Sequence, residues 1–408
     1  MTATLERYFG LAQRGSDVRT EMAAGVTTFL TMAYIAFVNP QILSDAGMPF
    51  DAVFVATCVA AALSSLVMGL LANYPIALAP GMGLNAFFAY GVVLGLGYDW
   101  EVALGAVFIA GLLFLALSVT PVRRRIIEAV PRALKLAIPA GIGLFLGILA
   151  LQNAGIIQAS EATMVTAGDL TAPAPVLALA GFSVIVALAA RGVPGAPLIG
   201  MLGVSVVGIA FGVSEWQGFA SLPPSPGPAL LALDIAGALQ VGMIAIILTF
   251  LIVDLFDTTG TLIGVAHQAK LLDERGRLPR IERALIADST GTVGGALLGT
   301  SPVTSYIESA AGVSAGGRTG LTAVVVAGLF LACLMARPLV DVAWDDVTES
   351  AAAVVTALAI PLTFSIADGI GLGFLTYVAI KVLAGRPREC SPTLVAVSVV
   401  FALKFALL

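Results

Sequence analysis

Two aspartates lie within one long apolar segment of the chain. Segment 238–265 contains Asp254 and Asp257, and Thr261 follows one helical turn later. The three residues stand at positions i, i+3 and i+7, so a helix places them on one face. Two carboxylates this close in a medium of low dielectric repel each other, so at least one is expected to hold a proton near neutral pH. Such a pair can load and unload a proton, unless it only caps the end of a helix.

Another acidic side chain, Glu308, follows a short stretch rich in hydroxyl groups. The residues of this stretch that favour a helix start are Ser301, Pro302, Thr304 and Ser305. Hydroxyl side chains cap helices, and proline suits a first helical turn. The sequence therefore predicts a half-helix that begins here, with Glu308 projecting from its first two turns toward a cavity at its positive end.

The matching place in the first half of the chain holds an amide. Asn85 lies five residues after Pro80 and offers both donors and an acceptor, although it could simply cap a helix. Carboxylates, an amide and hydroxyls together suit a planar, neutral, hydrogen-bonding ligand, and without aromatic rings they would equally serve a cation. The rings that could stack on such a ligand are Phe37, Phe87, Phe256 and Tyr306.

The composition excludes an ordinary soluble enzyme, a disordered chain and a nucleic-acid binder. Of 408 residues, 59% are hydrophobic and only 11% are charged, against about 25% charged residues in a typical soluble domain. A surface with so few charges can face lipid. The three cysteines and the single histidine show no metal-ligand spacing, so neither a metal nor a cofactor is predicted.

Apolar runs of about 20 residues cross a bilayer as helices, and the chain contains about fourteen. They are residues 22–43, 51–71, 76–97, 101–120, 133–152, 174–191, 196–213, 238–265, 283–299, 302–317, 319–337, 350–366, 369–385 and 391–408. The N-terminal residues 1–21 are polar and lack the apolar core of a signal peptide.

Basic residues indicate the orientation of these spans. They cluster at 121–135 and 267–283, which places both loops and the N-terminus in the cytoplasm, whereas 153–173 lacks them as an outer loop should. With fourteen spans the basic loop 381–389 falls outside, so either one span is miscounted or this loop departs from the rule. In this orientation Asp288 is expected near the cytoplasmic end of its span.

The two halves of the chain each have an interrupted third span. Residues 79–85 and 299–305 place proline and small residues where a helix should continue. The tetrapeptide at 136–139 also recurs at 358–361, although so short a match can arise by chance. Seven spans is an odd number, so a second copy would run inverted, with 214–237 as the linker. Paired, broken spans predict the binding site of a secondary transporter.

Several stretches of the sequence resemble the AzgA-like purine permeases, which belong to the nucleobase–cation symporter-2 (xanthine/uracil permease) group. The stretches are 25–35, 38–40, 79–88, 254–261 and 301–309. The resemblance implies an all-α polytopic membrane protein with about fourteen spans in a seven-plus-seven inverted repeat. It also implies a short extended strand before a half-helix in spans three and ten.

The resemblance further implies two domains that move against each other. A substrate-binding core would comprise 22–120 and 238–337, which are spans 1–4 and 8–11. A gate would comprise 121–213 and 350–408, which are spans 5–7 and 12–14. Residues 1–21 would remain a cytoplasmic segment.

Members of this family import hypoxanthine, guanine or adenine with protons across the cell membrane. The resemblance therefore implies a purine nucleobase and a proton as partners, and no enzymatic activity. The family's carboxylates fall on Asp254, Asp257 and Glu308 as residues for both substrate and proton, and its amide falls on Asn85. The other side chains expected at the substrate are Phe87, Phe256, Thr304 and Ser305. The sequence leaves open which aspartate contacts the purine, and whether the protein forms a homodimer.

Other hypotheses fit the residues less well. An anion exchanger of the same fold needs a cationic group at the half-helix ends, where Asn85 and Glu308 stand. A membrane-embedded enzyme needs a metal cluster or a nucleophile–base pair, and a channel needs a continuous polar stripe along several spans. Uracil or xanthine as substrate, and sodium in place of the proton, stay open.

Overall fold

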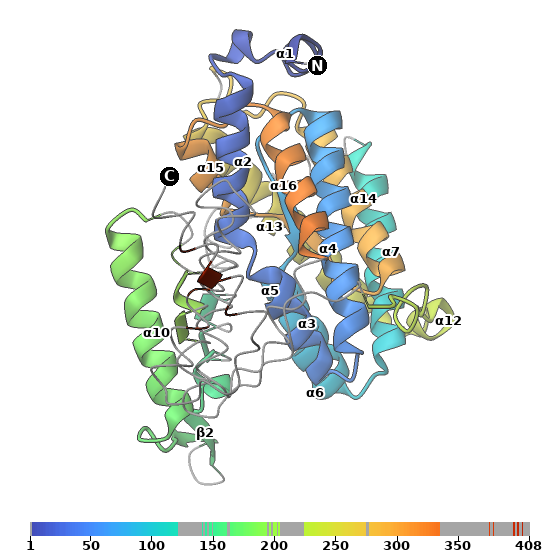
Figure 1. The fold of residues 1–408 in the computed structure, drawn as a ribbon. Helices are drawn as coiled ribbons and strands as arrows, with labels where there is room; N and C mark the ends of the chain where they lie inside the picture. Colours follow the sequence, from blue (N-terminus) through green and yellow to red (C-terminus); the bar gives the residue numbers. More distant parts are fainter. Residues whose placement is uncertain are drawn as a thin grey trace. The chain divides into compact units, whose positions relative to one another are not determined.

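The computed structural model describes residues 2–120, 150–160, 164–193 and 224–334 except 275 and 276, with isolated positions in 141–149, 196–204 and 375–402. This part of the chain is helical apart from two small sheets (Figure 1). Its helices are α1 (Thr2–Phe9), η1 (Ala12–Arg14), α2 (Val18–Met32), α3 (Ile35–Asp45), α4 (Phe50–Val67), α5 (Met82–Ala86), α6 (Leu94–Leu96), α7 (Trp100–Ser118), α10 (Pro173–Ala190), α12 (Ile235–Ala238), α13 (Met243–Gln268), α14 (Ile281–Leu298), α15 (Ser309–Ser314) and α16 (Gly320–Cys333). Two π-helical turns, η2 (Met68–Ala72) and η3 (Phe87–Val93), continue α4 and α5. The strands are β1 (Leu78–Pro80), β2 (Ile157–Ser160), β3 (Met164–Ala167) and β4 (Val303–Ser305).

Several of these helices can cross a membrane. Within the described part of the chain, the helices that are both long and apolar enough are Val18–Asp45, Phe50–Ala72, Trp100–Ser118, Pro173–Ala190 and Met243–Gln268. Met82–Leu96 and Gly320–Cys333 are shorter apolar helices. All of them begin and end within a few residues of predicted spans. The total of fourteen spans stays a prediction.

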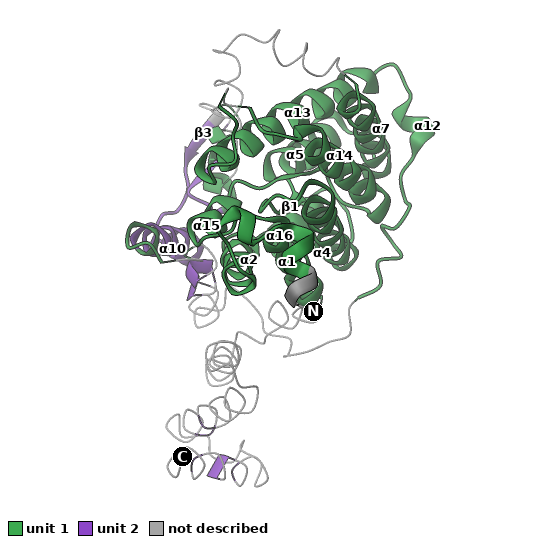
Figure 2. Ribbon diagram, turned by 90° about the horizontal axis from the view of Figure 1, so that it is seen from above, with its two compact units in different colours: residues 1–153, 188–198, 222–334 green, residues 154–187, 199–221, 335–408 purple. Residues whose placement is uncertain are grey.

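The chain divides into two compact units, which Figure 2 colours separately. The first contains residues 1–153, 188–198 and 222–334, and the second contains 154–187, 199–221 and 335–408. Much of the predicted gate, including 121–140 and 335–373, lies outside the described residues. The core and gate domains therefore stay predictions.

Helix packing in the first unit depends on small residues. Helix α16 contacts both α2 and α4, and α14 contacts both α4 and α7 (Figure 1). A Cβ atom placed on Gly320 would lie 2.0 Å from the carbonyl oxygen of Gly69, so only glycine fits where α16 meets the end of α4. Close backbone approach of this kind is typical of helices packed within a membrane.

Strands β1 and β4 form a two-stranded sheet in the first unit. They pair antiparallel, with Leu78 opposite Ser305 and Pro80 opposite Val303, and all of their residues are buried. One further backbone bond at each end extends the pairing: Gly81 N–H donates to Pro302 O at 2.9 Å, and Tyr306 N–H donates to Ala77 O at 3.0 Å. The two strands thus satisfy each other's backbone groups where water is absent.

The structure corrects the predicted start of the second half-helix. The predicted capping residues Thr304 and Ser305 lie in β4, and Pro302 precedes that strand instead of opening a helix. Helix α15 begins only at Ser309, so Glu308 is the residue just before the helix and does not project from its first two turns. Pairing with β1 therefore outweighs the local capping preference. The extended strands that the family resemblance implies in spans three and ten are present.

In the second unit, the described residues form a hairpin and a helix. Strands β2 and β3 pair antiparallel, with Ile157 opposite Ala167, and α10 follows them. The predicted outer loop 153–173 thus contains a hairpin, and its side of the membrane stays a prediction. Its backbone groups are satisfied within the hairpin, a pairing that a search for apolar runs does not detect.

A buried carboxylate ties α2 to the start of α16. Glu21 is fully buried and accepts hydrogen bonds from the backbone N–H groups of Arg318 and Thr319 at 2.9 and 3.2 Å. The hydroxyl of Thr322 donates to the same carboxylate at 2.5 Å. The first N–H groups of a helix have no partner within it, so Glu21 supplies one from a helix far away in sequence.

Replacing Glu21 with alanine is expected to lower the free energy of unfolding by about 2–4 kcal/mol, because its buried donors lose their acceptor. The measurement is the midpoint of thermal unfolding of the purified protein in detergent. Glu6, which is exposed on α1, provides the matched control. Equal midpoints for Glu21→Ala and Glu6→Ala would contradict the assignment of Glu21 as an anchor.

Candidate functional site

A cavity of about 220 Å³ lies inside the first compact unit, where α5 and α13 meet the end of β4. The residues that line it are Gly81, Met82, Gly83, Leu84, Val253, Asp257, Thr261, Thr304, Tyr306, Ile307 and Glu308. The wall combines carboxylates, hydroxyls and a phenol with apolar side chains. A largely apolar hollow with a few convergent polar groups is typical of a small-molecule site.

Helix α13 places its two aspartates differently. Asp257 and Thr261 line the cavity, whereas Asp254 is only 3% exposed and does not line it. The hydroxyl of Thr292 on α14 lies 3.1 Å from Asp254 Oδ2. Residues three apart on a helix differ in direction by about 60°. One can therefore reach the cavity while the other contacts the neighbouring helix.

A third buried aspartate, Asp288, lies in the middle of α14. Its carboxylate accepts hydrogen bonds from Ser305 Oγ and Thr258 Oγ1, each at 2.9 Å. Asp288 is fully buried behind β4, about two turns after the start of α14, and its predicted place near the cytoplasmic end of a span stays a prediction. Ser305, predicted at the substrate, contacts Asp288 and does not line the cavity. The rule that acidic residues inside apolar spans are functional candidates would have identified Asp288 from the sequence.

Glu308 lines the cavity and is held from the first span. Tyr34, between α2 and α3, donates its phenol O–H to Glu308 Oε1 at 2.7 Å. The hydroxyl of Thr31 lies 3.4 Å from the backbone oxygen of Glu308. Tyr34 was not predicted at the site, although a phenol within a predicted span could have indicated it.

The aromatic side chains predicted at the substrate fall in different places. Tyr306 is the aromatic residue of the described cavity wall, and its O–H donates to Pro80 O at 2.5 Å. Phe87 packs edge-on against Phe250, with ring centroids 5.1 Å apart, and does not line the cavity. Phe256 is half-buried and does not line it either. Neighbouring rings on α13 and η3 therefore pack within the protein.

Asn85 belongs to a buried polar network behind the cavity. Its Nδ2 donates to Asn39 Oδ1 at 2.9 Å, and Ser301 Oγ donates to the same oxygen at 3.2 Å. Asn39 Nδ2 donates to Thr57 and Thr300 at 2.7 and 2.8 Å. The network joins α3, α4 and α5 to the segment before β4. Asn85 thus connects the half-helix to its scaffold.

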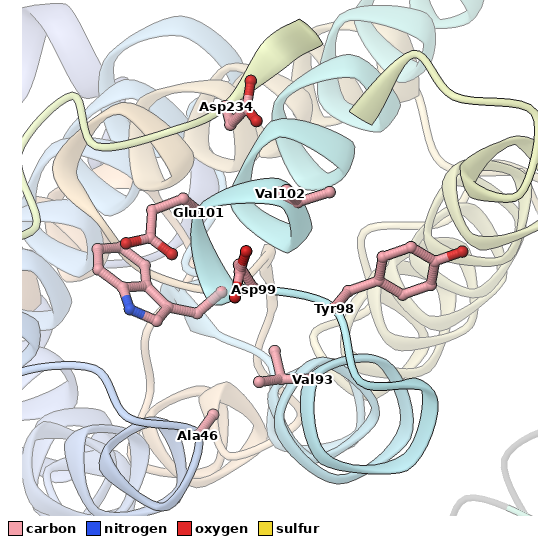
Figure 3. Close-up of a pocket in the computed structure, with 8 residues that line it drawn as sticks. Ala46, Val93, Tyr98, Asp99, Glu101, Val102 and Asp234 are labelled. Carbon is pink, nitrogen blue, oxygen red and sulfur yellow. The ribbon is translucent and has the colours of Figure 1, made fainter. Parts of the chain in front are cut away.

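A second cavity, of about 340 Å³, lies at the start of α7 (Figure 3). Its polar and aromatic lining residues are Tyr98, Asp99, Trp100, Glu101 and Asp234. The carboxylate of Asp234 caps α12 by accepting the N–H of Gly237 at 3.0 Å. None of the predicted site residues lines this cavity. The first cavity is therefore the candidate site.

Comparison with known proteins shows which family the chain belongs to. Residues 19–368 match the family model of the xanthine/uracil permeases, which is described as the permease family. The chain belongs to the xanthine/uracil permease family. This permease is 45% identical to the adenine permease AdeP of Escherichia coli, over 98% of this chain and 95% of that one. It is 42% identical to the guanine/hypoxanthine permease PbuO of Bacillus subtilis, over 98% and 100% of the two chains.

The family membership agrees with the architecture of the permease. Its fold is similar to the transmembrane domain of the cyanobacterial bicarbonate transporter BicA, with a TM-score of 0.61 and 16% identity over 94% of each chain. At this identity the likeness concerns the fold alone. The permease is a multi-pass membrane transporter and not an enzyme.

Proposed function

We propose that this permease imports purine nucleobases across the cell membrane by symport with protons. The observation that carries the proposal is the cavity in whose wall Asp257 and Glu308 meet the hydroxyls of Thr261 and Thr304. The relatives named for adenine and for guanine and hypoxanthine support a purine as the substrate.

The chemistry of the wall suits a neutral heterocycle. The edges of a purine carry N–H donors beside nitrogen or carbonyl acceptors. The carboxylates of Asp257 and Glu308 accept N–H groups, while the hydroxyl of Thr261 can donate to the acceptors. The side chains of Val253 and Ile307 would cover the ring. The described wall contains no cationic side chain, which favours a neutral base over an anion.

The same carboxylates and their buried neighbours offer places for the coupling proton. Asp257 and Glu308 lie at the cavity, and Asp254 and Asp288 lie behind it on α13 and α14. Acidic groups inside membrane proteins are costly and often form proton relays. We assign Asp257 and Glu308 to the purine, and Asp254 to proton exchange with Asp257 and Glu308.

Transport requires the cavity to open alternately to each side of the membrane. We place the site in a core of segments 22–120 and 238–337, which would move against a gate of segments 121–213 and 350–408. About fourteen spans in an inverted repeat, with the N-terminus in the cytoplasm, would form these two domains. The pairing of β1 and β4 supports this, because broken segments in both halves meet at one place.

Uptake by cells that lack their own purine transporters tests the function. Cells that produce this permease are expected to accumulate labelled hypoxanthine, guanine or adenine, and more so at the more acidic of two external pH values. Replacing external sodium with potassium should leave uptake unchanged. Unlabelled hypoxanthine, guanine or adenine should compete, whereas uracil, xanthine and bicarbonate should not.

Each alternative has its own outcome in this experiment. Loss of uptake without sodium would replace the proton by sodium as the coupling ion. If only uracil or xanthine competes, the substrate is that base and not hypoxanthine, guanine or adenine. Uptake equal to that of cells carrying the empty vector, with the protein present in the membrane, would overturn the proposal.

A further inference from the structure

Tyr34 lies at a break in the first membrane-crossing helix. The helical stretch Val18–Asp45 is interrupted at Ala33 and Tyr34, between α2 and α3. The Tyr34 side chain is 9% exposed, and its O–H donates to Glu308 Oε1 at 2.7 Å. The bond joins residues 274 positions apart in the sequence. The first span therefore contributes to the cavity through Glu308 and not as a lining residue.

We propose that Tyr34 is a positioning residue, which holds Glu308 so that carboxylate oxygen Oε2 is the one left to the purine. The inference rests on the proposed function of the cavity. Glu308 is the N-cap residue of the short helix α15, and its side chain makes no capping hydrogen bond that would fix it there. The phenol supplies the missing restraint.

The bond also determines where a proton on Glu308 resides. A phenol O–H needs an acceptor, and the carbonyl-type oxygen of a neutral carboxyl group provides one. With Oε1 accepting from Tyr34, the proton on a neutral Glu308 lies on Oε2. The other titratable side chains of the cavity wall are Asp257 and Tyr306, and the Tyr306 O–H is engaged by Pro80 O.

The orientation of Glu308 then matters directly to purine binding. An ionised Oε2 accepts an N–H group of the base, whereas a protonated Oε2 donates to a ring nitrogen. One atom would thus serve both the proton and the purine. Without the phenol, the carboxylate can rotate and must be ordered anew on each binding event, which weakens binding.

The test is the variant Tyr34→Phe, which keeps the ring and removes the donor. We expect KM for the transported purine to rise about tenfold while the maximal rate changes by less than about twofold, because a charge-assisted hydrogen bond is lost without loss of packing. Tyr90→Phe is the matched control, since the Tyr90 O–H donates to Asp45 Oδ2 at the same 2.7 Å and neither residue lines this cavity. Its KM should equal that of the unmodified permease.

A double-mutant cycle shows whether Tyr34 acts through Glu308. Equilibrium binding of labelled purine to the purified protein is measured for Tyr34→Phe, Glu308→Gln and the double variant. Tyr34→Phe is expected to weaken binding about tenfold alone and by less than about twofold in the Glu308→Gln background. Full additivity, or an unchanged KM in a Tyr34→Phe protein that transports, would overturn the inference.

Two further measurements separate the ways in which the experiment can fail. If the unmodified permease takes up no purine, the proposed function fails, and the role of Tyr34 fails with it. If Tyr34→Phe does not accumulate in the membrane, Tyr34→Met replaces it, since a long thioether side chain also lacks a donor. Tyr34→Met is expected to weaken purine binding about tenfold or more alone, and by less than about twofold in the Glu308→Gln background. Binding as tight as in the unmodified protein would count against the inference.

Discussion

Replacing Asp257 with asparagine is expected to reduce purine uptake by about 100-fold or more. Asp257 lines the cavity wall close to Glu308 and Thr304. Asparagine preserves the size of the side chain but removes a charged acceptor, which costs about 1.5–3 kcal/mol for a charge-assisted hydrogen bond. It also removes a group that can exchange the coupling proton. The initial rate of uptake, corrected for the amount of protein in the membrane, is the measurement.

Two further variants serve as controls for the Asp257→Asn result. Glu101→Gln removes a carboxylate from the second cavity and is expected to leave uptake unchanged, because nothing in the proposed cycle passes through that cavity. Asp254→Asn should spare equilibrium binding of purine, since Asp254 contacts α14, and should abolish accumulation driven by a pH gradient. Normal uptake by Asp257→Asn would remove Asp257 from the site.

The sequence predicted two aspartates within one apolar segment but not the separate environments of the two side chains. Asp254 and Asp257 follow from an apolar run interrupted by carboxylates, a signal that depends only on neighbours in the chain. Which of them faces the cavity depends on the position of Thr292 on another helix. The helical pattern of α13 alone contains no information about that contact.

The pairing of β1 with β4 also depends on residues that are distant in sequence. Thr304 and Ser305 have side chains that cap helices, and the local pattern predicts a helix start there. The backbone pairs instead with residues 78–80, which lie more than two hundred positions earlier. A residue-by-residue preference cannot include a partner so distant in sequence, whereas the resemblance to the family could supply both strands.

The aromatic candidates were predicted because their rings can stack on a ligand, without knowledge of where the rings lie in the fold. Phe87 and Phe256 lie beside residues of the site in sequence, but neither lines the cavity. Tyr34 and Asp288 were missed because their partners, Glu308 and Ser305, come from other elements. Contacts between elements therefore decide most of what the sequence leaves open.

The largest effect on stability is expected from replacing Asn39 with alanine. Asn39 is fully buried, and its amide uses both donors and accepts two hydrogen bonds. Alanine would remove the hydrogen bonds to Asn85, Thr300, Ser301 and Thr57, of which Thr57 still donates to Val53 O. Unpaired buried polar groups cost about 1–3 kcal/mol each, although rearrangement recovers part of this. We expect the free energy of unfolding to fall by about 3–5 kcal/mol, measured by thermal unfolding in detergent.

Two variants separate hydrogen bonding from packing in this network. Gln41→Ala removes an exposed amide from the same helix and should leave the unfolding midpoint unchanged. Asn39→Asp keeps the shape and, as a buried neutral acid, has one O–H donor in place of the two N–H donors to Thr57 and Thr300, so it should lose roughly half of the stability that Asn39→Ala loses. An Asn39→Asp protein as stable as the unmodified one would show that packing, not the amide, holds this region together.

The same variant relates stability to transport. Asn39 binds Asn85 of α5 and Ser301 before β4, and both α5 and β4 contribute residues to the cavity wall. If the network only stabilises the fold, Asn39→Asp molecules that reach the membrane should transport with an unchanged KM. If it also sets the spacing of the broken segments, KM should rise in step with the loss of stability. We expect the second result, because the residues that lose their bonds are directly joined to the cavity wall.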